Sequence, residues 1–155
     1  MRYFLAISLM MIGTAAVSQQ FNAEIMPPWD GIDVPDGQQC TLFDGSGATP
    51  AFALSNLPDA TQTIHIEFND LSFPPLAENG GHGIIGFDAS GEGAMQLPSV
   101  PGLSADLPSG IFVVRAARTS GRYASDGYLP PCSGGRGNEY SADITAWVFH
   151  GRQLG

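Results

Sequence analysis

The chain has 155 residues, enough for one domain with its own hydrophobic core, and 43% of them are hydrophobic, which excludes an intrinsically disordered chain. Its 20 Gly and 12 Pro residues argue against long helices and favour short strands joined by turns. The formal net charge is −9, with six Arg and no Lys, so nucleic acid and anionic lipid surfaces are excluded as partners because they need clustered positive charge.

The N-terminus has the three parts of a secretory signal peptide. Arg2 supplies the positive charge, residues 3–13 form an almost wholly apolar run, and Ala16 and Ser18 are small residues at the −3 and −1 positions of a cleavage site. The run is too short to span a membrane comfortably. We therefore predict a signal peptide at 1–18 and a secreted or periplasmic protein; a retained anchor and a buried first strand are the alternatives.

The part of the chain after the leader is predicted to be one domain at 40–155, preceded by a polar, Pro-containing N-terminal segment at 19–39. Alternation predicts a half-buried strand at 61–68, with Ile64 and Ile66 on one side and His65 on the other, where it is interpreted as an ordinary surface residue.

Three further strands follow from apolar, β-branched runs, and no stretch carries a convincing helical stripe. These strands are expected at 83–87, 111–117 and 144–149. The last is apolar on both faces, which predicts a strand covered on both sides. Residues 88–110 are interpreted as a loop, and four arginines between residues 115 and 136 form either a positive patch or ion pairs with neighbouring acids.

The chain has only two cysteines, Cys40 and Cys132. In an oxidising compartment such a pair predicts a disulfide, and two separate buried thiols are the alternative. No Cys-x-x-Cys spacing indicates a redox motif or a zinc site, and three scattered histidines make a weak metal case. No metal or cofactor is therefore expected.

A series of short motifs follows in a specific order from residue 40 onwards. The motifs are Cys40, Asp44-Gly45, Thr49-Pro50, Leu57-Pro58-Asp59-Ala60-Thr61, Asp70, Pro74, Gly80-Gly81-His82-Gly83, Leu107-Pro108-Ser109-Gly110, Gly121-Arg122, Gly127-Tyr128-Leu129-Pro130-Pro131-Cys132 and Gly137-Asn138-Glu139-Tyr140. Their order and spacing over residues 40–149 resemble the phosphatidylethanolamine-binding protein family, in its bacterial Raf-kinase-inhibitor-like branch.

This resemblance implies a mainly β fold with a large antiparallel sheet packed on a smaller one and few short helices. It also implies a small pocket near a sheet edge that accepts phosphate-like or carboxylate-like anions, and it is compatible with a homodimer. Carried over residue by residue, the pocket is lined by Asp70, His82, Pro130, Asn138 and Tyr140.

The chemistry of these residues is suited to a weak anion site. A His and a Tyr hydroxyl can donate hydrogen bonds, and glycines at 134, 135 and 137 let backbone N–H groups approach a ligand. An Asp repels a bare anion, so it would either fix the His tautomer or share a proton with a protonated phosphate. Departures from the family pattern make the pocket more open. Ser72 replaces a second acid, Gly81 and Gly83 replace aromatics around the His, and Asn138 replaces a second His.

Each of these residues also has an ordinary structural interpretation. His82 suits a solvent-facing turn, Asp70 a turn cap, Tyr140 a strand residue with its ring packed, and Pro130 a rigid turn.

Three functions are compatible with the sequence. The first is a secreted binding protein with a shallow pocket for a phosphate- or carboxylate-bearing group, such as a small anion or a phospholipid head group. The second is a protein-interaction or inhibitor module that uses loops 71–82 and 119–139. The third is an unrecognised hydrolase, which ranks last because no catalytic motif such as a Gly-x-Ser-x-Gly nucleophile turn is present. We expect a binding protein and no enzyme.

Overall fold

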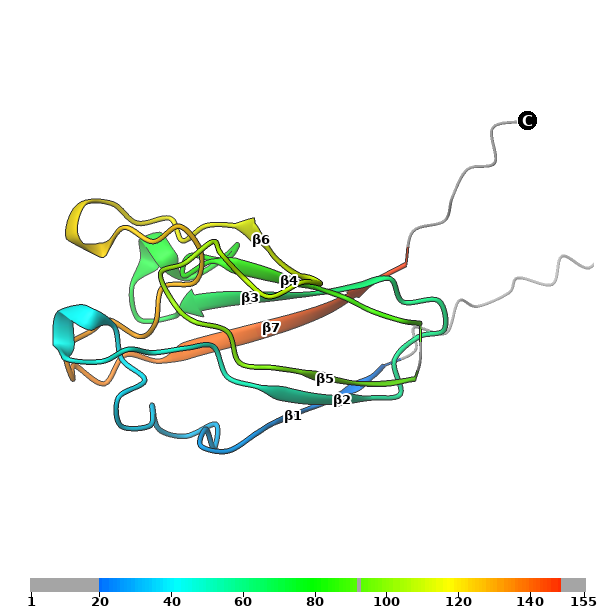
Figure 1. Ribbon diagram of the computed structural model, residues 1–155. Helices are drawn as coiled ribbons and strands as arrows, with labels where there is room; N and C mark the ends of the chain where they lie inside the picture. The colour runs from blue at the N-terminus through cyan, green and yellow to red at the C-terminus, as the bar shows by residue number, and fades with distance from the viewer. Residues whose placement is uncertain (1–19, 92, 149–155) are drawn as a thin grey trace, which may run out of the picture.

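The computed structural model describes residues 20–91 and 93–148. Seven strands form two antiparallel sheets that pack face to face (Figure 1). The strands are β1 (Asn22–Ile25), β2 (Phe52–Ser55), β3 (Thr63–Asp70), β4 (Ile84–Asp88), β5 (Ala94–Leu97), β6 (Ile111–Arg115) and β7 (Tyr140–Trp147). The smaller sheet has the order β1-β2-β5 and the larger β6-β4-β3-β7. The predicted mainly β architecture of a larger and a smaller sheet is confirmed; the signal peptide call at 1–18 lies outside the described residues.

The core lies between the two sheets and follows from the alternation of β3. Ile64, Ile66 and Phe68 of this strand are almost fully buried, whereas His65 and Glu67 face outwards. Burying each large apolar side chain contributes roughly 1.5–3 kcal/mol, so one alternating strand already favours one face of the sheet as the core. The core is completed by residues of both sheets: Phe52, Leu54, Leu57, Ile85, Phe87, Leu97, Val100 and Tyr128.

Three strands, β1, β2 and β5, lie where none was expected, and β2 at Phe52–Ser55 pairs with both of the others. β1 forms within the polar segment 19–39, which the sequence separates from the domain at 40–155, and it pairs with β2 along its whole length. β5 forms within 88–110, which the sequence interprets as a loop. Each of these strands has only four residues, too few for a period of two to stand out from the turns around it.

The last strand also differs from its prediction. β7 begins at Tyr140 rather than 144, and it is an edge strand that pairs with β3 alone. Its outward face is open: Trp147 is 45% exposed. The prediction of a strand covered on both faces is therefore wrong, and the outward Trp147 instead packs against the His65 ring of the neighbouring β3, with 5.5 Å between ring centroids.

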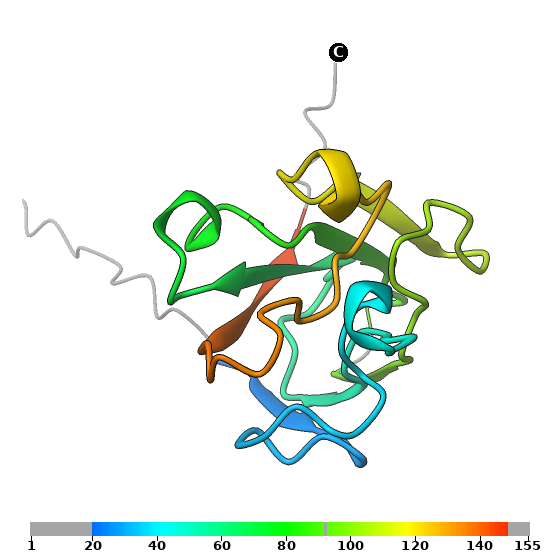
Figure 2. The same ribbon diagram turned by 90° about the vertical axis from the view of Figure 1, so that its left-hand side faces the viewer.

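Three short 3₁₀ turns and the long connections gather at one end of the sandwich, which Figure 2 views directly. The turns are η1 (Thr41–Phe43), η2 (Pro74–Leu76) and η3 (Gly121–Tyr123). At this end the predicted disulfide is present: it joins Cys40 to Cys132 across 92 residues, with their Cα atoms 5.2 Å apart. Over residues 20–91 and 93–148, no helix is long and apolar enough to cross a membrane.

Candidate functional site

Four of the predicted site residues meet at the end of the large sheet, where β3 finishes and β7 starts. Asp70 is the last residue of β3 and lies opposite Tyr140, the first residue of β7. The amide of Asn138 donates to the Asp70 carboxylate over 2.8 Å. The His82 ring packs edge-on against the Tyr140 ring, with 5.4 Å between centroids. The fold therefore brings Asp70, His82, Asn138 and Tyr140 into one cluster.

His82 is a buried member of this cluster and not a solvent-facing loop residue. Only 3% of it is exposed, and its Nδ1 lies 2.7 Å from the carbonyl oxygen of Leu129. Because a carbonyl oxygen only accepts, Nδ1 carries the proton and donates it. Burial lowers the pKa of His82, while the Leu129 carbonyl and the charge of Asp70 act in the opposite direction. The neutral ring is therefore the form that the fold favours.

Asp70 is buried, and its carboxylate holds two neighbouring residues in place by hydrogen bonds. One carboxylate oxygen accepts the N–H of Ser72 over 3.0 Å, and the other accepts the amide of Asn138. The Ser72 hydroxyl in turn accepts the N–H of Glu139 over 2.9 Å. Ser72, at the position of a second acid in the resembled family, thus joins the end of β3 to the start of β7.

The Tyr140 hydroxyl lies on the other side of the cluster. It accepts the N–H of Cys132 over 3.3 Å. Burial raises the pKa of Tyr140, so the hydroxyl keeps its proton at neutral pH. A neutral hydroxyl that already accepts a hydrogen bond still has one hydrogen to donate.

Pro130 is placed differently from the other four. It is fully buried, and its ring packs against the backbone at Gly47 and Gly102, where no Cβ would fit. Its neighbour Pro131 borders both of the cavities described below, and Pro130 borders neither. Only the tertiary structure separates the two prolines of this pair.

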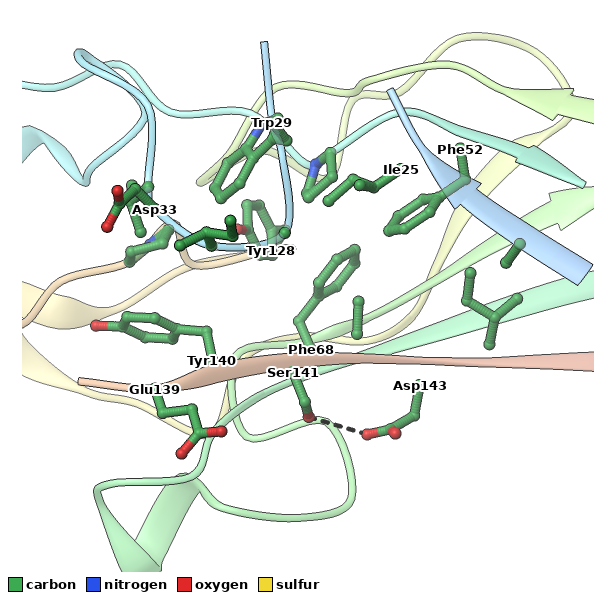
Figure 3. Close-up of a pocket in the computed structure, with 18 of the residues that line it drawn as sticks. Ile25, Trp29, Asp33, Phe52, Phe68, Tyr128, Glu139, Tyr140, Ser141 and Asp143 are labelled. Carbon is green, nitrogen blue, oxygen red and sulfur yellow. Dashed lines mark hydrogen bonds between the residues drawn. The ribbon is translucent and has the colours of Figure 1, made fainter. Parts of the chain in front are cut away.

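The larger of two cavities is a cleft of about 1160 Å³ between the β1 edge of the small sheet and the β7 edge of the large one. Figure 3 shows Ile25, Trp29 and Phe52 on one wall facing Phe68 and Tyr140 on the other. This volume lies just above the usual range for small-molecule sites, which is about 300–1,000 Å³. The sequence does not predict this cleft, because its wall from β1 and residues 26–34 lies in the polar segment 19–39 that the sequence separates from the domain. Within residues 26–34, Trp29 is the large aromatic residue that could have indicated a packed surface.

The smaller cavity, of about 700 Å³, adjoins the cleft and shares Asp33, Pro131, Asn138 and Tyr140 with it. Its floor is the glycine loop, which we define as residues 133–138. Gly134, Gly135 and Gly137 all have positive φ angles, of 65°, 77° and 71°. Successive backbone N–H groups in such conformations form concave sites for anions.

The glycine loop has a further property. The N–H groups of Cys132 and Glu139 on either side of it donate to Tyr140 and Ser72. Within the described residues, none of the five N–H groups from Gly134 to Asn138 has an acceptor. These donors are turned to solvent or to the cavity and are free to bind a ligand.

The charges around the two cavities are negative. Asp33 borders both, Asp44 borders the smaller one, and Glu139 and Asp143 border the cleft. Three arginines lie elsewhere: Arg115 and Arg118 donate to the backbone carbonyls of Asn79 and Glu78, and Arg122 lies over the Tyr123 ring. Arg136 is an exposed member of the glycine loop itself, although it borders neither cavity. In the described part of the chain, no three His, Cys, Asp or Glu side chains are grouped to hold a metal ion.

Comparisons of the chain with protein-family models, curated proteins and solved structures found no match. The resemblance to the phosphatidylethanolamine-binding family stays a prediction based on the order of motifs in the sequence.

Proposed function

We propose that the chain is an exported binding protein, similar in kind to phosphatidylethanolamine-binding proteins, that holds a small phosphate- or carboxylate-bearing group in its smaller cavity. The observation that carries this proposal is the run of five backbone N–H groups from Gly134 to Asn138 that have no acceptor within the described protein. An anionic oxygen placed among several such donors is stabilised by charge-assisted hydrogen bonds.

The Tyr140 hydroxyl supplies a further donor at the same place, since it borders the smaller cavity and keeps its proton at neutral pH. Asp70 and His82 act one layer further in. Asp70 holds the Asn138 amide, and His82 packs against the Tyr140 ring, so the buried pair orients the two residues that meet the ligand. In this role Asp70 does not contact the anion, which removes the repulsion that a carboxylate in the pocket would cause.

The acidic surroundings limit the affinity and select the ligand. Asp33 and Asp44 border the same cavity, so a bare dianion binds weakly, in the millimolar range. A ligand that carries a cationic group beside its anionic one is favoured, because the cation is placed against these carboxylates. An amino-bearing phosphate or carboxylate, as in a zwitterionic head group, has this arrangement.

Export is part of the proposal. The leader pattern at 1–18 predicts secretion, and a disulfide of the Cys40–Cys132 kind is rare in reducing compartments. Detection of the mature N-terminus at Gln19 in an extracytoplasmic fraction would support this part, and recovery of the intact chain from the cytosol would contradict it.

Binding is tested by NMR titration of the uniformly ¹⁵N-labelled mature protein with inorganic phosphate, acetate and phosphoethanolamine. We expect the amide signals of Gly134, Gly135 and Gly137 to shift with saturation at millimolar concentrations, and phosphoethanolamine to bind most tightly of the three. Tyr140→Phe should weaken binding about five-fold, which corresponds to roughly 1 kcal/mol for one lost hydrogen bond.

The matched control is Tyr123→Phe, which removes the hydroxyl of a half-buried tyrosine outside both cavities. It should bind the three compounds like the unaltered protein. The proposal is contradicted if the glycine-loop amide signals stay unchanged when phosphate is added to millimolar concentrations. It is also contradicted if the Tyr140→Phe variant binds the three compounds as tightly as the unaltered protein.

A further inference from the structure

One edge of the large sheet is open along the whole length of β7. β7 has β3 on one side, and no strand formed by residues 20–91 or 93–148 lies on its other side. The N–H of Leu71 donates to Glu139, and β3 and β7 continue in register from Asp70 opposite Tyr140 to Thr63 opposite Trp147. In an antiparallel pair the backbone bonds alternate, so the odd-numbered residues of β7 bond to β3.

The even-numbered residues of β7 therefore direct their N–H and C=O groups away from β3, towards the open edge. These residues are Tyr140, Ala142, Ile144 and Ala146. β3 agrees with this assignment, because Phe68, opposite Ala142, uses its N–H and C=O to bond to Gly83 and His82 on the β4 side. Among the described residues no partner takes up the outward groups of Ala142, Ile144 or Ala146. The edge is a ready template for one more strand.

The glycine loop lies at the beginning of this same edge, since residues 133–138 lead directly into β7. Its free N–H groups and the outward backbone groups of β7 thus follow one another along the chain. A ligand with a carboxylate at one end and a peptide backbone behind it matches both sets of groups.

The two sides of the open edge differ in chemistry, as Figure 3 shows. Phe68 and Tyr140 lie on the face of β7 that turns towards Trp29 and Tyr128, whereas Glu139, Ser141 and Asp143 lie on its other face, where they border the cleft at its rim. Ser141 and Asn69 both donate to one oxygen of Asp143, which fixes that carboxylate beside the strand. An added strand would present alternate side chains to an apolar wall and to a row of carboxylates.

We infer that the ligand of this site is the free C-terminus of an extended peptide with alternating apolar and basic residues. The inference rests on the proposed function, and it specifies the anion as a peptide carboxylate. The carboxylate binds the N–H groups of Gly134 to Asn138, and the peptide backbone pairs with the outward groups of β7. Its apolar side chains enter the cleft, and its basic side chains face Glu139 and Asp143.

The direction and length of the bound peptide follow from the same geometry. Its C-terminus lies at the start of β7, so the peptide runs antiparallel to that strand. The outward groups extend from Tyr140 to Ala146, which at about 3.4 Å per residue takes a peptide of about six residues. A second copy of this chain is disfavoured as the occupant, because both copies carry a formal charge of −9 and the pairing would bring Asp143 residues together.

The inference is tested with synthetic peptides and the intact mature protein. The probe is a fluorescein-labelled six-residue peptide that alternates Lys and Val and ends in Val with a free carboxylate. Three matched controls are the same peptide with a C-terminal amide, a peptide with Glu in place of Lys, and a pair of peptides N-methylated at either odd or even positions. Binding is measured by fluorescence anisotropy, and hydrogen exchange of the β7 amides is followed by NMR.

We expect the amide peptide and the Glu peptide to bind at least ten-fold more weakly than the probe. One of the two N-methylated peptides should bind normally and the other not at all, because only alternate N–H groups of an added strand reach β7. The exchange of the Ala142 and Ile144 amides should slow at least ten-fold on binding, while that of Asp143, already bonded to β3, should not change.

Other outcomes separate this inference from the proposed function. If phosphate and acetate shift the glycine-loop amides but the probe binds no better than acetate, the peptide inference is overturned and the anion site stands. If the probe and the peptide with a C-terminal amide bind equally well, the carboxylate is not recognised and the inference is also overturned. If neither simple anions nor the probe shift the glycine loop, both proposals fail.

Discussion

The connection that leads into β7 has two halves with opposite properties. The first half, residues 127–132, is buried, and four backbone hydrogen bonds tie it to distant segments: its carbonyls accept from Ala117, Leu103 and Cys40, and Leu129 donates to His82. The disulfide adds a covalent tie at Cys132. The second half, the glycine loop at 133–138, is mostly exposed and donates no backbone hydrogen bond from Gly134 to Asn138 within the described residues.

Both halves are rich in Gly or Pro, so composition does not explain the difference. The two halves differ in the segments that surround them. The first half crosses the end of the sandwich, where the segment at η1, the 101–104 turn and His82 supply hydrogen-bond donors and acceptors. The second half extends past these segments. The contrast suggests how a binding loop is built. The buried half holds the ends of the free half in place, and the free half keeps its donors for a ligand.

The largest effect should come from removing the covalent tie of the buried half. Replacing both cysteines, Cys40→Ala with Cys132→Ala, opens a loop of 92 residues and should lower the free energy of unfolding by about 4 kcal/mol. Urea unfolding measures this. Amides of 127–132 should exchange faster, while those of Gly134 to Asn138, unprotected in both proteins, should not change. A loss below about 1 kcal/mol would show that backbone bonds alone hold the buried half.

A smaller effect should come from His82, which joins the buried half to the end of β3. His82→Leu leaves the Leu129 carbonyl without its donor in the interior and should cost about 2 kcal/mol at neutral pH.

The same variant should change the pH dependence of stability. Burial lowers the pKa of His82, so the unfolded chain binds the proton at a higher pH than the folded protein does. The stabilisation is fully present above the ordinary His pKa of 6.5 and is lost as the pH falls through the lower folded value. Unfolding free energy should therefore decline from about pH 7.5 to about pH 5.5, with a shallower decline in His82→Leu.

His65 is the matched control for this pH prediction, since burial also lowers its pKa but it lies on the outer face of β3. His65→Gln should remove a smaller part of the pH dependence. An equal or larger change in His65→Gln than in His82→Leu would show that the buried ring is not the main titrating group.

Asn138 joins the glycine loop to the buried Asp70 through a side-chain hydrogen bond, and its replacement should lower the stability of the protein moderately. Asn138→Ala removes the hydrogen bond to the Asp70 carboxylate and should cost about 1.5 kcal/mol. Acetate binding should weaken as well, because the end of the glycine loop is no longer held. If stability falls but acetate binding stays the same, Asn138 does not position the loop.

The smallest effect should come from the middle of the free half. Gly135 has a φ of 77° and no atom near its missing Cβ, so Gly135→Ala should cost only about 1 kcal/mol, from backbone strain alone. Gly47→Ala is the contrasting control, because its Cβ would overlap the Gln38 backbone and the Pro130 ring; it should cost about 3 kcal/mol. Equal costs at the two positions, measured by urea unfolding, would contradict the division into a packed and a free half.

The sequence by itself determined what depends on local patterns. The alternation around Ile64 and Ile66 predicts β3 and its buried face, and two cysteines in a chain with a leader pattern predict the Cys40–Cys132 bond. The resemblance carried by the order of motifs predicts a site of Asp70, His82, Asn138 and Tyr140, and the structure places these four residues together.

Only the tertiary structure decided which surfaces are covered. Whether β7 is central or at an edge depends on which strands pair with it, and no local pattern in 140–147 contains that information. The same holds for Pro130 and Pro131, which are both buried although only Pro131 borders the cavities, and for the acids at 33 and 143, which meet the cleft from opposite ends of the chain. The physical reason is that strand pairing and burial are long-range outcomes of packing, whereas periodicity and turn preference are properties of neighbouring residues.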